Sequence, residues 1–188
     1  MSKANPTDFR VDLRRSAHQW DRKTKCMRAV WEFCLKPLYN ILPFKRNRLR
    51  VPLLRLMGAT IGECVYLQQR IDILCPWELE IGDFVAIAHD VTILNFTKVR
   101  IDSMTVVSQY AHLCTGTHDY SRPHFPLTFK PIVVGPESWI ASAAFVGPGV
   151  VVGRGCVIGA HSVVMKDTPP WMVCAGNPCK EIKPRTIG

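Results

Sequence analysis

One aliphatic position repeats every six residues through the second half of the chain. A period of six fits neither an α-helix, which repeats about every 3.6 residues, nor a simple alternating strand. It fits a short strand followed by a corner, so that three hexads close one triangular coil and successive coils stack through parallel strands. The pattern predicts a β-solenoid whose aliphatic side chains fill the interior. The repeated residues are Val134, Ile140, Val146, Val152, Ile158 and Val164.

Small residues occupy two further places in each hexad. We expect the fifth residue to point inward, where there is little room, and glycine at the second place to let the chain turn without steric cost. The fifth places hold Ser138, Ala144, Val150, Cys156, Ser162 and Thr168. The second places hold Gly135, Ala141, Gly147, Gly153, Gly159 and finally Met165.

The first half of the coil follows the same phase with longer turns. The pattern restarts at Ile61, Ile81 and Ile101, so each of these coils has two residues more than three hexads, which we place at a corner. After Leu113 the phase breaks until Val134. Residues 117–131 therefore leave the coil as a loop. Long loops that project from a rigid scaffold commonly carry function.

The charge of the chain is concentrated at its N-terminal end. Residues 1–57 contain 14 Lys and Arg against 4 Asp and Glu, whereas residues 58–188 contain 10 against 11. The nearly neutral body is therefore not a nucleic-acid binder by its electrostatics, and the N-terminal segment is the part suited to an anionic partner.

Apolar spacing predicts an amphipathic helix over residues 21–42, broken near Pro37, and a short second helix over residues 52–57. We expect these helices to cap the open end of the coil and hide its exposed strand edge. A basic amphipathic surface over residues 21–57 also favours peripheral contact with an anionic membrane, and the two roles are compatible.

The cysteines and the N-terminus favour a cytoplasmic location, with a peripheral position at the inner membrane face if the basic helices touch lipid. The eight cysteines form no CxxC pair, which is typical of buried small residues in a reducing compartment. The polar start of the chain lacks the apolar stretch of a signal peptide. No glycine-rich nucleotide-binding motif is present.

Residues 113–120 read Leu-Cys-Thr-Gly-Thr-His-Asp-Tyr and lie at the end of the first three coils. This segment resembles the catalytic stretch of the hexapeptide-repeat acyltransferases. With residues 76–83 upstream, the chain is most similar to the branch that acetylates bacterial exopolysaccharide, as in colanic acid biosynthesis. The resemblance covers roughly residues 50–183. Segments similar to the coenzyme A side of sugar and galactoside O-acetyltransferases are residues 139–150, 158–167 and 175–178.

The resemblance implies an all-β solenoid, a left-handed parallel β-helix of hexapeptide repeats with an N-terminal helical cap and an ejected loop. The left hand comes from the family, because spacing cannot show it and parallel crossovers are usually right-handed. We divide the chain into the basic capping segment 1–57, the acyltransferase domain 58–171 and a tail 172–188 that contributes to coenzyme A binding. The resemblance also implies a homotrimer with clefts between prisms.

The implied reaction transfers an acetyl group from acetyl-coenzyme A to a sugar hydroxyl. A hydroxyl is a weak nucleophile, so a base must accept its proton, and neutral imidazole suits this because its unperturbed pKa is about 6.5. His118 ends the hexad that begins at Leu113, which predicts an outward-facing corner at the mouth of the loop. Resemblance and placement agree on His118 as general base and later as acid toward the thiolate. The structural alternative is a surface histidine at a turn.

The resemblance carries a coenzyme A site onto matching positions. Ser142 and Ala160 would line the groove for pantetheine and adenine, and the neighbourhood of Ser142 would donate to the oxyanion. The chain has Met165 where the family often has Thr, which removes a side-chain hydrogen bond. Lys180 and Lys183 stand where the family often has arginine, so the positive charge is kept but the bidentate hydrogen bonding of a guanidinium is lost. A solvated basic tail is the alternative for these lysines. The remaining matched positions are Lys166, Lys180 and Lys183.

Four further residues are weaker candidates for binding the acceptor. Asp90 and Asn95 precede His118 by about one coil, and Asp119 either orients His118 or shapes a turn. Tyr120 lies on the loop. The sequence does not fix whether the acceptor is a sugar, a nucleotide sugar or a lipid-linked oligosaccharide.

Two other classes of function compete with this interpretation. A metal enzyme resembling carbonic anhydrase needs several converging histidines, but His112 and His118 are six apart and lie on successive faces, and His89 has no partner at suitable spacing. We therefore expect no metal. A non-catalytic scaffold that recruits a membrane complex is disfavoured by the family motifs around His118 and Lys166.

Overall fold

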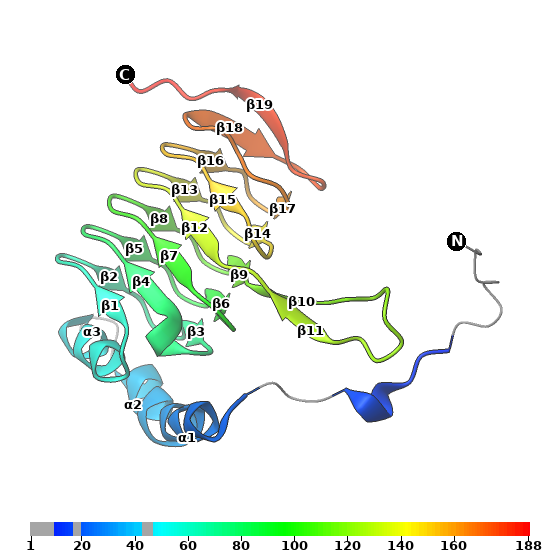
Figure 1. Ribbon diagram of the computed structural model, residues 1–188. Helices are drawn as coiled ribbons and strands as arrows, with labels where there is room; N and C mark the ends of the chain where they lie inside the picture. Colours follow the sequence, from blue (N-terminus) through cyan, green and yellow to red (C-terminus); the bar gives the residue numbers. More distant parts are fainter. Residues whose placement is uncertain (1–9, 17–19, 43–46) are drawn as a thin grey trace.

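The computed structural model describes residues 10–16, 20–42 and 47–188. A three-sided prism of about six stacked coils makes up most of the molecule (Figure 1). Each side of the prism is one sheet, here named A, B and C in the order in which the chain visits them. The corners are named AB, BC and CA after the sheets they connect. The β-solenoid predicted from the period of six is confirmed.

The strands are short, as a hexad requires. Sheet A contains β1 (Thr60–Ile61), β4 (Leu79–Ile81), β7 (Val99–Ile101), β12 (Ile132–Val134) and β15 (Val151–Val152). Sheet B contains β2 (Tyr66–Leu67), β5 (Ala86–Ile87), β8 (Val106–Val107), β13 (Trp139–Ile140), β16 (Val157–Ile158), β18 (Met172–Ala175) and β19 (Lys180–Pro184). Sheet C contains β3 (Asp72–Ile73), β6 (Thr92–Leu94), β9 (His112–Cys114), β14 (Phe145–Val146) and β17 (Val163–Val164).

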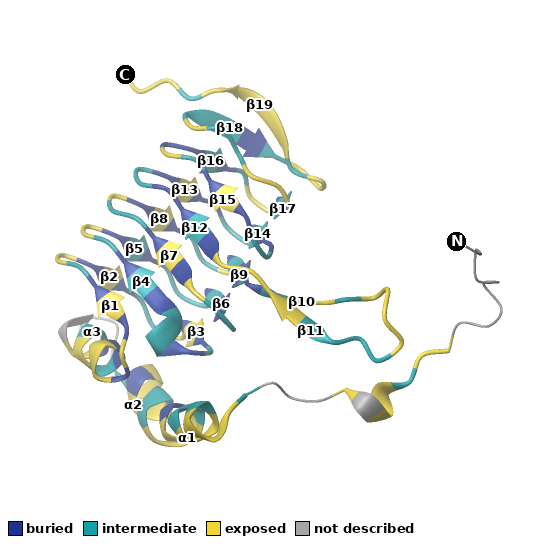
Figure 2. Ribbon diagram, viewed as in Figure 1, coloured by how far each residue is buried: buried dark blue, intermediate teal, exposed yellow. Residues whose placement is uncertain are grey.

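Parallel pairing places equivalent hexad positions directly above one another. In sheet A, Ile61 pairs with Ile81, Ile81 with Ile101, and Ile101 with Val134. The six aliphatic residues of the second half are all buried, and so are five of the six small residues at the fifth places, with Thr168 half-buried (Figure 2). The interior is therefore a column of aliphatic side chains that runs the length of the prism.

Glycine at the second place of the hexad has a different role from the predicted one. The left-handed turn falls two residues later and is made mostly by other residues, such as Phe84 at φ 54° and Tyr110 at φ 63°. At the second place the next coil is simply too close. A Cβ on Gly147 would lie 2.5 Å from the sulfur of Met165, and one on Gly153 would lie 2.6 Å from the nitrogen of Pro170.

The two extra residues of each early coil lie at corner CA. In the first coil this corner contains the short 3-10 helix η4 (Pro76–Glu78). The predicted loop leaves from the same corner two coils after η4. It is not irregular, because β10 (Gly116–His118) and β11 (Leu127–Phe129) form an antiparallel hairpin that projects from the prism (Figure 1).

Helices cover the N-terminal end of the prism (Figure 1). The predicted break near Pro37 is present as a π-helical turn just before that residue, whose ring removes a backbone donor. The second helix begins at Asn47 rather than residue 52, so Pro52 lies inside it. No helix in the described ranges combines the length and apolarity needed to cross a bilayer. The elements are η2 (Leu13–Arg15), α1 (Arg22–Val30), η3 (Trp31–Leu35), α2 (Lys36–Ile41) and α3 (Asn47–Leu56).

The helices hydrogen-bond to the first coil. The indole nitrogen of Trp31 donates to the carbonyl of Ile73 at 2.8 Å. The guanidinium of Arg55 donates to the carbonyls of Ile61 at 2.5 Å and Gly62 at 2.9 Å. These carbonyls belong to the end of the stack, where no further coil accompanies them, so the helices cap an otherwise open edge. At the other end the tail is ordered, because β18 extends sheet B and β19 folds back on it.

Candidate active site

His118 ends β10 and is exposed on the projecting hairpin, opposite Leu127. Its Nδ1 lies 2.7 Å from the carbonyl oxygen of Phe125. A carbonyl can only accept a hydrogen bond, so Nδ1 carries the proton and Nε2 carries the lone pair. The ring is therefore held in the tautomer that a general base needs, with its basic nitrogen away from the anchoring bond.

The base of the hairpin is tied to the coil below it. Thr115 is buried, and its hydroxyl donates to the carbonyl of Leu94 at 3.1 Å. Gly116 lies against the ring of Phe96, so closely that a Cβ would come within 2.6 Å of it. Farther out, the backbone N–H of Asp12 donates to the carbonyl of Pro123 in the hairpin loop. The hairpin is thus anchored at its base and contacted near its tip.

Asp119 does not hold the ring of His118. Its carboxylate accepts hydrogen bonds from the backbone N–H and the hydroxyl of Ser121 and lies 3.3 Å from the guanidinium of Arg122. These contacts lower the pKa of Asp119, mainly through Ser121. The turn interpretation of Asp119 fits this geometry, and a backbone carbonyl takes the orienting role. Tyr120 follows it on the loop and is 81% exposed.

The side chain of Asn95 lies inside the stack of coils. The residue is fully buried. Its amide donates to the carbonyl of Cys75 at 2.6 Å and accepts from the N–H of Cys75 at 3.0 Å. Asn95 therefore ties one coil to the next beneath the hairpin, which favours a structural role, and its contact with the acceptor stays a prediction.

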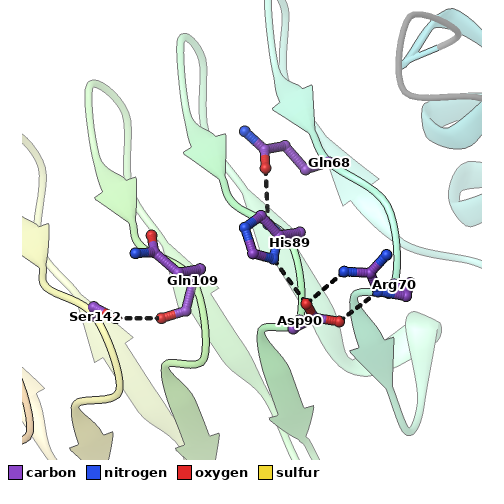
Figure 3. A network of polar contacts seen from close by, with 6 residues as sticks. All are labelled: Gln68, Arg70, His89, Asp90, Gln109 and Ser142. Carbon is purple, nitrogen blue, oxygen red and sulfur yellow. Dashed lines mark hydrogen bonds and ion pairs between the residues drawn. The ribbon is translucent and has the colours of Figure 1, made fainter.

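Corner BC carries a ladder of polar side chains, shown in Figure 3. The Asp90 carboxylate lies 2.7 Å from two nitrogens of Arg70 and 2.7 Å from Nδ1 of His89. Arg70 and then His89 lower the pKa of Asp90. The His89 ring meets Tyr110 edge-on, with ring centroids 5.5 Å apart. Asp90 is thus held in place on a surface that offers imidazole, phenol and guanidinium groups.

Sequence reasoning missed Arg70 and His89 as partners of Asp90. A signal was present for the first, because Arg70 and Asp90 are 20 residues apart, the length of one early coil, and so occupy the same corner on successive coils. Higher on this corner, the Ser142 hydroxyl donates to the carbonyl of Gln109 at 3.1 Å (Figure 3). Ala160 lies exposed one coil farther along.

The other residues expected at coenzyme A lie around corner CA and the tail. Met165 lines a cavity of about 130 Å³ together with Thr117 of the hairpin. Lys166 and Lys180 line a second cavity, of about 160 Å³. Lys183 is exposed on β19. One chain therefore brings His118 and Met165 near one corner but leaves Ser142 and Ala160 on another.

No three His, Cys, Asp or Glu side chains gather as metal ligands within residues 10–16, 20–42 and 47–188. His112 packs edge-on against Phe145, with ring centroids 5.3 Å apart, and burial lowers its pKa. This is the environment of a packed neutral histidine.

A parallel β-helix with an oriented histidine on a projecting hairpin is the arrangement expected of hexapeptide-repeat acyltransferases. A family model described as bacterial transferase hexapeptide (six repeats) matches residues 131–166. A protein of Escherichia coli K12 that carries the provisional name colanic acid biosynthesis acetyltransferase WcaF is 42% identical over 156 residues, covering 83% of this chain and 86% of that protein. The chain belongs to the hexapeptide-repeat acetyltransferase family.

Two further comparisons agree. Galactoside O-acetyltransferase of E. coli K12 is 32% identical over 137 residues, covering 71% of this chain and 68% of that protein. A solved structure of a galactoside acetyltransferase in complex with coenzyme A is similar with a TM-score of 0.82 and 26% identity, over 90% of this chain and 86% of that one. The related structures are left-handed β-helices, which confirms the expected hand.

Proposed function

We propose that this protein is an acetyl-coenzyme A-dependent O-acetyltransferase that modifies a sugar hydroxyl in exopolysaccharide biosynthesis of the colanic acid type. The hydrogen bond from Nδ1 of His118 to the carbonyl of Phe125 carries the proposal, because it leaves Nε2 as a proton acceptor on an exposed hairpin. The relatives named for colanic acid and galactoside acetylation support a sugar acceptor. A cytoplasmic location remains a prediction from the sequence.

In this mechanism Nε2 of His118 accepts the hydroxyl proton while the oxygen attacks the thioester carbonyl. The Phe125 carbonyl stabilises the imidazolium that forms, because Nδ1–H already points at it. As the tetrahedral intermediate collapses, the carbon–sulfur bond breaks and the imidazolium returns its proton to the thiolate. The products are an acetylated sugar and coenzyme A.

Binding of coenzyme A is proposed for the residues that the family motifs indicate. Lys166 and Lys180 line one cavity and offer two ammonium groups to the phosphates. Lys183 lies beyond them on β19. The small side chains of Ser142 and Ala160 leave corner BC open for the pantetheine arm, and Ser142 is the proposed donor toward the oxyanion.

We propose a homotrimer because the candidate residues lie on two corners of the prism. His118 projects from corner CA, whereas Ser142 and Ala160 lie at corner BC. Contact between corner CA of one copy and corner BC of the next is heterologous, and three such contacts close a ring. The hairpin then reaches the neighbour's groove and completes a site between two chains.

The test of the base is an acetyl-coenzyme A assay against hexoses, nucleotide sugars and lipid-linked oligosaccharides. His118→Ala should lower turnover roughly 10²- to 10⁴-fold while coenzyme A binding persists. His118→Asn is the matched variant, because its amide can still donate to the Phe125 carbonyl but cannot accept the proton. Equal loss in both variants supports a base, whereas near-normal turnover of His118→Asn would leave only a structural role.

Mixed oligomers test the shared site. Ala160→Trp places a bulky ring on exposed corner BC, so it should block the groove without disturbing the core. Co-assembly of this variant with His118→Ala should restore about one quarter of wild-type activity, because about one in four interfaces then pairs two intact halves. No recovery in mixed trimers, or a monomer by light scattering, would contradict a site between chains.

A further inference from the structure

The consecutive helical elements α1, η3 and α2, named here the N-terminal helix, are apolar on two sides, and only one of these sides packs against the prism. Trp31 and Tyr39 are fully buried against the coil. On the other side, Val30 is 48% exposed, and Phe33 and Ile41 are each 79% exposed. The spacing of these three residues, with exposed Pro37 between the last two, keeps them along one side of the helix. The capping role does not explain this second apolar stripe.

The stripe continues onto the neighbouring helix. Leu49 and Leu56 of α3 are 44% and 74% exposed. A groove of about 410 Å³ connects the two helices, and Val30 and Leu56 both line it. Its other lining residues are Cys26, Met27, Met57 and Gly58. The helical end therefore presents one apolar surface, named here the end face: Val30, Phe33, Pro37, Leu38, Ile41, Leu49 and Leu56.

Positive charge accompanies the end face. Arg22, Lys23 and Lys25 are exposed in the first turns of α1, next to the start of the stripe. The acidic residues nearby already have partners within the helical segment. Asp21 accepts a hydrogen bond as the N-cap of α1, and Glu32 forms an ion pair with Lys36. The excess of 14 basic over 4 acidic residues in positions 1–57 has no counterpart in the body.

We propose that the end face docks on an anionic lipid bilayer, with Phe33 and Ile41 inserted below the headgroups and the lysines and arginines of α1 beside the phosphates. Large exposed apolar side chains next to a basic cluster are the combination that interfacial helices use. A second copy fits less well, because joining two end faces would bring two strongly basic segments together. The proposal is independent of the catalytic one.

The experiment is flotation of the purified full chain with vesicles of phosphatidylcholine alone and with vesicles in which roughly a third of the lipid is phosphatidylglycerol. Binding is expected to the anionic vesicles only and should fall as salt is raised. The double variant Phe33→Ser with Ile41→Ser should weaken this binding by at least roughly tenfold, because each side chain loses its buried apolar area. Lys23→Gln with Lys25→Gln should weaken it and flatten its salt dependence.

The matched control is Phe84→Ser with Ile187→Ser, which removes the same residue types from exposed places outside the end face. This control should bind vesicles as the wild type does, and all variants should keep the oligomeric mass of the wild type. Three results would overturn the proposal: no binding to anionic vesicles, equal loss in the control, or a smaller oligomer in Phe33→Ser with Ile41→Ser without lipid. The last would make the end face a contact between copies.

Discussion

Asn95 distinguishes a structural role from a role in acceptor binding. Its side chain pairs with both the N–H and the carbonyl of Cys75 in a fully buried place. Asn95→Ala removes both bonds and leaves the N–H of Cys75 without a partner, at a cost of about 1–3 kcal/mol, whereas the carbonyl of Cys75 keeps the hydrogen bond from the N–H of Glu78. The expected loss of unfolding free energy is about 2 kcal/mol, which for a chain of this length lowers the melting temperature by roughly 4–8 °C.

The assay is thermal unfolding by circular dichroism at matched protein concentration, alongside the KM for the acceptor. Asn40→Ala removes an exposed amide and serves as the control. It should leave the melting temperature nearly unchanged. If Asn95→Ala melts within about 2 °C of the wild type while its acceptor KM rises, then Asn95 contacts the acceptor and the structural argument fails.

Two further predictions concern corner BC and the hairpin. Arg70 and His89 lower the pKa of Asp90 from its ordinary 3.8, so the stabilisation from its charge is complete above about pH 4 and is lost as pH falls through the lower folded value. The melting temperatures of the wild type and Asp90→Asn should therefore differ steadily near neutral pH and converge in acid; parallel curves down to about pH 2 would contradict this. Gly116→Ala should lower kcat by at least roughly tenfold, because its methyl group meets the Phe96 ring at 2.6 Å and displaces the hairpin. Coenzyme A binding, measured by calorimetry, should persist, and unchanged turnover would show that the hairpin adapts.

The hexad pattern predicted the coil because a single physical rule, aliphatic residues facing a closed column, operates at every turn. The identity of the turn residues could not be read in the same way. Phe84 and Tyr110 adopt left-handed backbone angles that such side chains rarely take, so their residue types give no sign of the turn. Glycine at the second place of the hexad is required because the next coil lies so close, not because the chain turns there. This constraint is a contact between residues about one coil apart, which the local sequence does not reveal.

The candidate site was likewise predicted only in part from the sequence. His118 was predicted from motif and chemistry, but its anchor is a backbone carbonyl of Phe125, which no side-chain pattern reveals. Asn95 carries a polar side chain that reads equally well as a ligand or as a tie between coils, and only its burial decides. The spacing of 20 residues between Arg70 and Asp90 equals one early coil and predicts their pairing at one corner.

Stacking of the coils also sets a height. Parallel strands lie about 4.8 Å apart, and the chain completes three coils between the helical end and the start of the hairpin at Gly116. The projecting arm therefore stands roughly 14 Å above the first rung. Duplication of one early coil would move the hairpin one strand spacing farther from the helical end without altering the hairpin itself. The distance between the helical end and the candidate site can therefore vary independently of the chemistry.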